Sequence, residues 1–257
     1  MTWWTRMVLC VLLVGVGKLG CAAPALMVVP TRDGQNISYW WMPREGATAT
    51  VILLSGGSGG IGYKDAQPRS NNFLIRSRDL FEQQGLNVAL LGNPSDMREM
   101  DDTWRISESH RTDVLNVMTD IRRQTLAPIW LVGTSRGTVS VAALALGLQD
   151  QLAGVVLTAA ITSHSVTASV PRQAIDQLRL PVLIYHHRQD ACRITQAHET
   201  AAIFQALRQA RVKKLMVVDG GGDPVGDPCQ ARHWHGFIGM EERVVKDIAD
   251  WIRRPQP

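Results

Sequence analysis

Short apolar runs alternate with amphipathic segments along most of the chain. The runs have the length and β-branched content of buried strands, and they cover 26–29, 37–42, 48–54, 86–91, 129–132, 152–158, 182–185 and 214–218. The segments between them predict helices over 72–84, 107–124, 138–148, 169–178, 196–209 and 241–252. This order predicts an α/β protein with a mostly parallel, eight-stranded sheet that is covered by helices on both faces.

The first two strands differ from the others. Asp33-Gly34 lies between them and is typical of a hairpin turn, so they are expected to form an antiparallel edge of the sheet. After them, no repeat, linker or change of composition divides the chain. Residues 24–257 are therefore expected to form a single domain.

Residues 1–23 have the order of an export signal. Arg6 precedes an apolar run over 7–17, and small residues follow Lys18. The run is too short to span a bilayer, and it has no polar face that would suit a packed N-terminal helix. Cys21 after Leu19-Gly20 also fits a lipoprotein cleavage site, but Lys18 stands where an apolar residue is expected. The sequence thus favours export to a periplasm or out of the cell, with lipid attachment at Cys21 as the weaker alternative.

Composition excludes several classes of protein. Of the 257 residues, 45% are hydrophobic and 19% are charged, which suits a folded domain and not a disordered chain. The net charge is +4, and the predicted signal supplies two of these charges through Arg6 and Lys18, which leaves +2 for the rest (25 cations against 23 acids). A nucleic-acid partner therefore has no electrostatic support. No stable membrane partner is expected after signal cleavage, and oligomeric state is not predicted.

A candidate nucleophile follows the buried strand at 129–132. Gly133-Thr134-Ser135-Arg136-Gly137 matches the pattern G-x-S-x-G between a strand and a helix of small residues. The glycines permit a sharp strand-to-helix turn that holds the serine hydroxyl clear of the sheet at a helix N-terminus. The alternative is an ordinary turn bracketed by glycines.

A serine needs a base, and the base needs an acid that orients it. In this architecture the chain order is serine, acid, histidine, which selects Asp190 after the strand at 182–185 and His235 before the last helix. The rival histidine is His233. The rival acids are Asp223 and Asp227, which better suit turns. The remaining histidines are expected at the surface or the sheet edge: His110, His164, His186, His187 and His198.

With these residues the chain resembles the α/β-hydrolase family, in particular its small exported members of the esterase and dienelactone hydrolase type. The resemblance rests on the Gly133–Gly137 elbow, Asp190 and His235-Gly236-Phe237, and it covers nearly all of the chain after the signal. It implies Ser135 as nucleophile, His235 as general base and acid, and Asp190 as the orienting acid.

Two backbone amides are expected to stabilise the oxyanion of the intermediate. One belongs to Arg136, directly after the serine. The other is expected in Ser55-Gly56-Gly57-Ser58-Gly59-Gly60, with Gly57 and Ser58 as candidates; the family often has histidine where this chain has Ser55. A phosphate-binding loop is the alternative, but no lysine-threonine pair closes it.

Cys192 and Cys229 are the cysteines that remain after the predicted signal is removed. In an oxidising compartment they predict one disulfide, which would tie the loop of Asp190 to that of His235. The alternatives are two buried thiols, or a metal site, for which the close spacing of zinc ligands is missing. No metal and no cofactor are predicted.

The predicted function is hydrolysis of a small to medium soluble ester. About two dozen residues, 159–180, connect two strands where lipases often carry a helical lid, so no lid domain is expected. Arg136 and His164 could attract an anionic group, although solvated charge explains them as well. The alternatives are a catalytically silent exported binding protein, or a peptidase, thioesterase or haloperoxidase on the same scaffold.

Overall fold

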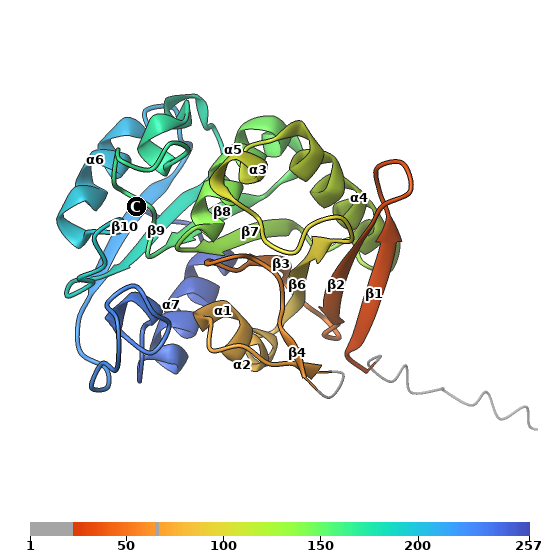
Figure 1. The fold of residues 1–257 in the computed structure, drawn as a ribbon, viewed down its shortest axis with the longest axis horizontal. Coiled ribbons are helices and arrows are strands. Elements are labelled where there is room, and N and C mark those ends of the chain that lie inside the picture. The colour runs from red at the N-terminus through yellow and green to blue at the C-terminus, as the bar shows by residue number, and fades with distance from the viewer. Residues whose placement is uncertain (1–22, 65–66) are drawn as a thin grey trace, which may run out of the picture.

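One sheet of eight strands runs through the part of the chain that the structure describes (Figure 1). The structure is a computed structural model, and it describes residues 23–64 and 67–257. In spatial order the strands are Ala25–Pro30 (β1), Asn36–Met42 (β2), Leu86–Pro94 (β6), Ala49–Leu54 (β3), Ile129–Thr134 (β7), Gly154–Thr158 (β8), Val182–His187 (β9) and Lys213–Val218 (β10). A separate small hairpin consists of Tyr63–Lys64 (β4) and Gln67–Pro68 (β5).

The predicted antiparallel edge is confirmed. β1 pairs with β2, and β2 pairs with β6, in antiparallel register, whereas all pairs from β6 to β10 are parallel. Leu54 is in register with Gly133, and Thr134 with Thr158. The carboxyl ends of the parallel strands therefore meet at one edge, where ligands of open α/β sheets bind.

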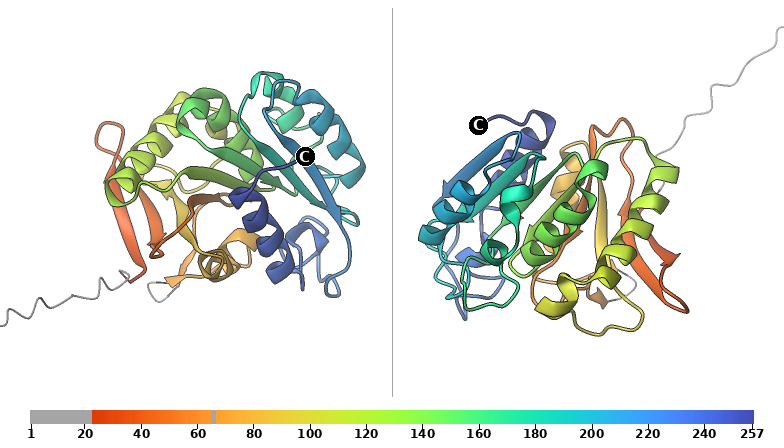
Figure 2. Two further views of the ribbon diagram at one scale, coloured as in Figure 1. Left: turned by 180° about the vertical axis from the view of Figure 1, so that it is seen from behind. Right: turned by 90° about the horizontal axis from the view of Figure 1, so that it is seen from above.

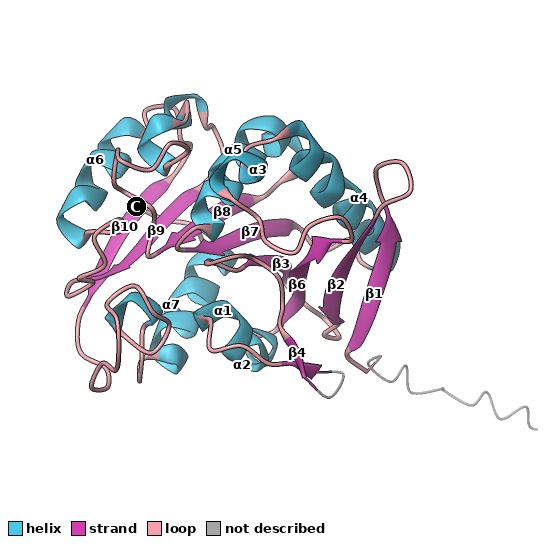
Figure 3. Ribbon diagram, viewed as in Figure 1, coloured by secondary structure: helices cyan, strands magenta, loops and turns pink. Residues whose placement is uncertain are grey.

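Helices cover both faces of the sheet, as predicted (Figures 2 and 3). One face carries Asp102–Arg105 (α3), Glu108–Gln124 (α4), Gly137–Leu148 (α5) and Thr200–Ala206 (α6). The other carries Phe73–Arg76 (α1), Arg78–Gln83 (α2) and Glu241–Arg253 (α7). Each face has its own apolar core, because every central strand is buried on both sides.

Local signals explain the long helix α4. The Ser107 side chain accepts a hydrogen bond from the His110 amide at 3.1 Å, which caps the first turn. Glu108 lies near the positive end of the helix dipole, and Arg122 and Arg123 lie near its negative end. The apolar stripe of this helix, which includes Val114, Val117, Met118 and Ile121, packs onto the sheet.

Three predicted helices differ from the structure. The helix expected over 72–84 is divided at Ser77, because Phe73, Leu74 and Ile75 are all buried although consecutive helical residues point about 100° apart. After the break, Phe81 in α2 is buried as well. The helix expected over 169–178 is replaced by two 3-10 turns, Val170–Arg172 and Ile175–Gln177.

Side-chain hydrogen bonds explain the second difference. The Gln173 amide donates to the carbonyl oxygens of Val139 and Ala168, at 3.2 and 2.9 Å, and Pro171 stands in the first of the two turns. Between 196 and 209, a 3-10 turn at Ala197–Glu199 leads into α6, which ends at Ala206. A further 3-10 turn, Gln149–Gln151, follows α5.

The predicted export signal, residues 1–23, lies outside the described residues except for Ala23, and so do Cys10 and Cys21. No helix in residues 23–64 or 67–257 combines the length and the apolar character that crossing a membrane requires.

Candidate active site

Ser135 occupies a strained turn between β7 and α5. Its φ is 53°, in the left-handed region that side chains other than glycine rarely adopt. The turn needs its glycines: a Cβ at Gly133 would lie 2.6 Å from the Gly137 carbonyl oxygen, and one at Gly137 would lie 2.1 Å from that of Leu54. The sharp turn therefore presents Ser135 at the sheet edge.

Hydrogen bonds hold the backbone of Ser135 in this conformation. Its amide donates to the carbonyl oxygen of Thr158 at 3.1 Å, and its own carbonyl accepts from the amide and the hydroxyl of Thr138, at 2.9 and 2.6 Å. Gly56 packs directly against it, since a Cβ at Gly56 would lie 2.8 Å from the Ser135 Cβ. The serine and the glycine-rich loop thus form one packed unit.

Asp190 follows β9 and is 6% exposed. Its Oδ1 accepts the amide N–H of Cys192 at 3.0 Å, and its Oδ2 accepts the hydroxyl of Thr195 at 3.0 Å. The Nδ1 atom of His235 lies 3.0 Å from the same Oδ2. The structure therefore brings together two of the predicted residues that are 45 positions apart in the chain.

His235 lies in a 3-10 turn, Trp234–Gly236, and is 5% exposed. Gly236 is required there, because a Cβ would lie 2.0 Å from the Ala231 carbonyl oxygen. Arg76 from α1 donates to the carbonyl of Gly236 and forms an ion pair with Glu241 at 2.8 Å. These contacts fix the turn, and the contacts of Nδ1 with Asp190 and Thr195 orient the His235 ring.

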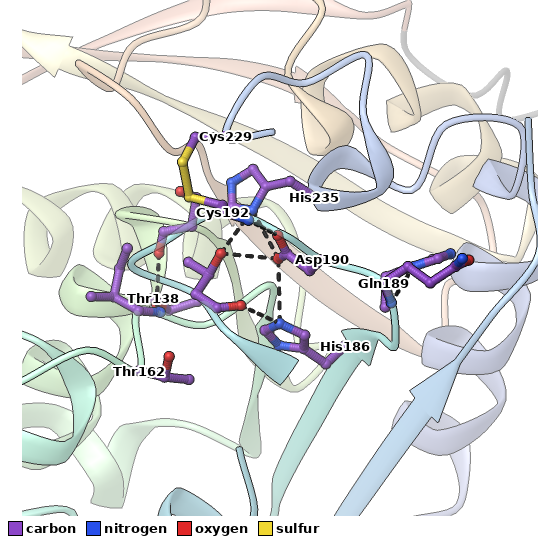
Figure 4. Close-up of polar contacts among 12 residues, drawn as sticks. Thr138, Thr162, His186, Gln189, Asp190, Cys192, Cys229 and His235 are labelled. Atoms are coloured by element: carbon purple, nitrogen blue, oxygen red, sulfur yellow. Dashed lines mark hydrogen bonds and ion pairs between the residues drawn. A yellow bond between two sulfur atoms is a disulfide. The ribbon is translucent and has the colours of Figure 1, made fainter. Parts of the chain in front are cut away.

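His186 is a second histidine beside Asp190. The prediction that it lies at the surface or the sheet edge is wrong, because its side chain is buried. β9 extends two residues further than expected, and His186 is fully buried within it. Its Nε2 lies 2.7 Å from the Thr195 carbonyl oxygen and 3.3 Å from Asp190 Oδ2. Because both neighbours accept hydrogen bonds, Nε2 carries the proton. Figure 4 shows Asp190 between the rings of His186 and His235.

The charge of Asp190 follows from these contacts. Burial raises the pKa of its carboxyl group, but the hydrogen bonds from His186 and His235 outweigh burial and hold this pKa well below its usual range. Asp190 is therefore an anion at neutral pH. As an anion it can accept the Nδ1 proton of His235, which leaves the Nε2 atom of that ring as a proton acceptor.

The alternative candidates for the acid and the base have no contact of this kind within the part of the chain that the structure describes. Asp223 and Asp227 are exposed, and Asp227 accepts the amide of Cys229 at 2.8 Å in a turn. His233 is buried edge-on against Trp234. Among the other histidines, His164 and His198 are exposed as predicted, whereas His110 and His187 are fully buried, contrary to prediction.

The two buried exceptions differ in their partners. His187 Nε2 lies 3.0 Å from the Gly220 carbonyl oxygen, its ring stacks on Trp234, and burial lowers its pKa. His110 lies in the first turn of α4 on its buried side, and burial together with the nearby Arg105 charge lowers its pKa to about 3. Both rings are therefore neutral at pH 7.

A cavity of about 390 Å³ opens at this site. Its lining includes Ser135, His235 and the glycine-rich loop 55–60, together with residues 70–73 and 229–231. Gly57 and Ser58, both predicted as oxyanion donors, line it. Within the described residues, the amides of Gly57, Ser58 and Arg136 donate to no protein acceptor, so they are free to bind an oxygen atom.

The predicted disulfide between Cys192 and Cys229 is present, with its Cα atoms 4.5 Å apart. It joins the loop of Asp190 to the loop that leads to His235, and Figure 4 shows it beside His235. The bonded sulfurs are not thiolates, which are the form of cysteine that binds a metal ion. In the described part of the chain, no group of three His, Cys, Asp or Glu side chains is arranged to hold a metal ion.

Thr195, His186 and Arg105 are the residues at this site that sequence reasoning missed. Thr195 touches both Asp190 and His235, and its hydroxyl oxygen lies 3.0 and 3.1 Å from them. Its place after Asp190 carries no recognised motif. A predicted strand that continued from 185 to 187 would have placed His186 on the buried strand. Arg105 lies behind the glycine-rich loop, and its hydrogen bond to Gly57 spans 48 positions.

Comparisons with known proteins give the fold. No family model matches the sequence, and no curated protein matches it either. Solved structures do match. An esterase from Pyrococcus furiosus has a TM-score of 0.66 at 14% identity, covering 90% of this chain and 92% of its own. A dienelactone hydrolase from Anabaena variabilis has a TM-score of 0.61 at 14% identity, covering 89% and 95%.

An α/β serine hydrolase without a lid, from Xanthomonas campestris, has a TM-score of 0.59 at 15% identity, covering 90% of this chain and 92% of its own. The protein therefore has the α/β-hydrolase fold. Between β8 and β9, where lidded members carry their insertion, the chain has the two 3-10 turns described above and connecting loop.

Proposed function

We propose that this protein is a serine hydrolase that cleaves small to medium soluble esters through an acyl-enzyme intermediate. One observation carries the proposal: His235, bonded to the buried Asp190 carboxylate at 3.0 Å, lines the same cavity as Ser135 and the unpaired amides of the glycine-rich loop. Nucleophile, base, acid and oxyanion donors are the parts that acyl transfer requires.

In the first half of the reaction, Ser135 Oγ attacks the ester carbonyl carbon while His235 Nε2 accepts the hydroxyl proton. The resulting imidazolium is stabilised by Asp190, which stays ionised. The carbonyl oxygen becomes an oxyanion that accepts hydrogen bonds from the amides of Arg136 and of Gly57 or Ser58. His235 then delivers the proton to the alcohol, which leaves as the tetrahedral intermediate collapses to the acyl-enzyme.

In the second half, water takes the place of the alcohol. His235 accepts a proton from the water as it attacks the acyl carbon, and the same oxyanion site stabilises the second tetrahedral intermediate. The intermediate collapses, the acid product leaves, and the proton on His235 returns to Ser135 Oγ. Ester, thioester and amide substrates share these steps, so peptidase and thioesterase activity are the nearest alternatives.

The cavity supports an uncharged substrate of modest size. Its volume of about 390 Å³ is at the small end of ligand sites, which are commonly about 300–1,000 Å³. No Asp, Glu, Lys or Arg is among the described residues that line it. Its polar lining includes the neutral side chains of Ser70, Asn71, Asn72 and Gln230. We expect a neutral ester with a short acyl chain, because a long one would leave apolar surface in a polar cavity.

Export is part of the proposal. The Cys192–Cys229 disulfide is consistent with an oxidising compartment, as is the signal expected at residues 1–23. This disulfide joins the loop of Asp190, the proposed acid, to the loop that leads to His235, the proposed base.

Kinetics on nitrophenyl esters of increasing acyl length test the proposal. We expect turnover of the acetate and butyrate esters, falling at longer chains, and loss of turnover in Ser135→Ala. The second candidate, a silent binding protein, predicts no turnover of any ester by the wild-type protein. A preference for long acyl chains would contradict the size prediction, and activity that survives in Ser135→Ala would contradict the mechanism.

A further inference from the structure

Arg105 is a buried cation that the mechanism above does not use. It ends α3, is 1% exposed and ranks first by size among the fully buried side chains of the described residues. Burying a guanidinium is costly unless a carboxylate pairs with it. Arg32 has such partners, in Asp96 and Asp113, each at 2.9 Å. Among the described residues, no carboxylate forms an ion pair with Arg105.

The contacts of Arg105 are with neutral groups. One terminal nitrogen donates to the hydroxyl of Ser140 in α5 at 3.1 Å, and the other donates to the carbonyl oxygen of Gly57 at 3.1 Å. Its Nε has no partner. Asp102 and Asp101 attract the charge from nearby and Arg136 opposes it, but Asp102 lies against Arg136, at 3.6 Å from its Nε. The positive charge is therefore directed at the glycine-rich loop.

The bond to Gly57 determines which way the next amide points. In a trans peptide, the carbonyl and the N–H that follows it point in opposite directions, and the described chain has no cis peptide. With the Gly57 carbonyl held on the buried side by Arg105, the Ser58 N–H is directed to the other side, where Gly57 and Ser58 line the cavity. Ser58 is held as well, since its carbonyl accepts the Met100 amide at 2.8 Å.

We propose that Arg105 is a positioning residue for the oxyanion hole: it fixes the Gly57–Ser58 peptide with its N–H toward the substrate, and its charge polarises that peptide as the oxyanion forms. This inference rests on the proposed hydrolase function. It explains why an unpaired cation is kept in the interior. Because Arg105 is buried, its charge, one peptide away from the cavity, stabilises a developing negative charge more than the same charge would in bulk water.

The protonation state agrees with this role. Burial lowers the pKa of Arg105 to about 10, which still leaves the side chain charged at neutral pH. The His110 ring, which lies close enough to feel the Arg105 charge, is neutral there and does not oppose it. An arginine that only filled space would have no need of its charge.

The test compares Arg105→Met, which removes the charge at similar length, with Arg105→Lys, which keeps it. Active sites are counted by fluorophosphonate titration, and kcat and KM are measured on nitrophenyl acetate. We expect Arg105→Met to lower kcat by about tenfold or more with KM within about threefold, since loss of one direct oxyanion donor costs about 10²–10³. Arg105→Lys should recover part of this loss.

A second readout separates positioning from simple stability. A trifluoromethyl ketone forms a hemiketal with the active serine, and its oxyanion occupies the same site as that of the intermediate. Its affinity should fall in the variants by the same factor as kcat/KM. The matched control is Arg122→Met, because Arg122 binds Gln151 by two hydrogen bonds at the opposite edge of the sheet; we expect its kcat to stay within about twofold.

The inference is overturned if titrated Arg105→Met keeps kcat within about twofold of wild type, if its loss lies in KM alone, or if the affinity of the ketone does not change. It is also overturned if Arg105→Lys is no better than Arg105→Met. If Arg105→Met does not fold, Arg105→Gln, which also removes the charge, takes its place: a parallel fall in kcat and ketone affinity supports the inference, and unchanged values overturn it. Activity that survives in Ser135→Ala would instead overturn the proposed function itself.

Discussion

Removing the Cys192–Cys229 disulfide is expected to reduce both stability and activity. The perturbation is the double variant Cys192→Ala, Cys229→Ser, in which the buried position receives the apolar residue. The bridge closes a loop with a sequence separation of 37 residues. In the chain-entropy treatment, a loop of this length corresponds to about 4 kcal/mol of unfolding free energy at 25 °C.

That loss converts into a large shift of the melting temperature. For a chain of this size each kcal/mol lowers Tm by about 2–4 °C, so the variant should melt about 8–16 °C below wild type. Activity should fall as well, because Asp190 accepts the Cys192 amide and Cys229 lines the cavity. A displacement of about 1 Å in a catalytic group can cost about a hundredfold in rate, and we expect a loss in kcat of about tenfold to a hundredfold.

The assays are thermal unfolding followed by circular dichroism, and ester kinetics well below the melting temperature of the variant. Treating wild type with a phosphine reductant should reproduce both losses, and the same treatment should leave the double variant unchanged. A variant that unfolds within about 1 kcal/mol of wild type and keeps its kcat would refute the view that this bridge holds the acid and histidine loops in place.

Further predictions concern the surroundings of Asp190 and one buried histidine. Asp190→Asn should lower kcat by about 10⁴, because an amide cannot stabilise the imidazolium; a loss below about tenfold in ester kinetics would contradict its role. Thr195→Val removes a hydroxyl that bonds Asp190, and should lower the unfolding free energy by about 2 kcal/mol in denaturant titrations, with Thr195→Ser recovering most of it. For His110, whose pKa falls from 6.5 to about 3 on folding, the unfolded state binds the proton first as pH drops, so the stability present above pH 6.5 is progressively lost toward pH 3. At pH 5 this loss is about 2 kcal/mol (about 1.5 units at 1.36 kcal/mol each), and His110→Leu should lack it when denaturant midpoints at pH 7 and pH 5 are compared; equal losses in both proteins would contradict it.

The sheet and the elbow could be predicted because their signals are local. Strand length, the Asp33-Gly34 turn and the glycines around Ser135 act within a few residues. The helix over 72–84 could not be predicted as two pieces, since the burial of three consecutive residues, Phe73, Leu74 and Ile75, is set by tertiary packing.

The contact between Asp190 and His235 could be predicted from the sequence, but the buried residues that surround it could not. Asp190 and His235 follow from chain order along a parallel sheet, and the structure brings them into contact. His186 and Arg105 are polar residue types that are usually found at the surface. Only tertiary contacts across the fold account for their burial. Such contacts join residues that are far apart in the chain, so no local sequence pattern reveals them.

In the proposed mechanism, His235, oriented by Asp190, makes Ser135 a nucleophile. The most direct test is the rate of fluorophosphonate labelling, with the modified residue located by peptide mass mapping in wild type and in His235→Gln. We expect a single adduct on Ser135, with loss of fluoride, and a rate that falls by about a thousandfold or more in the variant. An adduct on another residue, or equal rates in the two proteins, would contradict it.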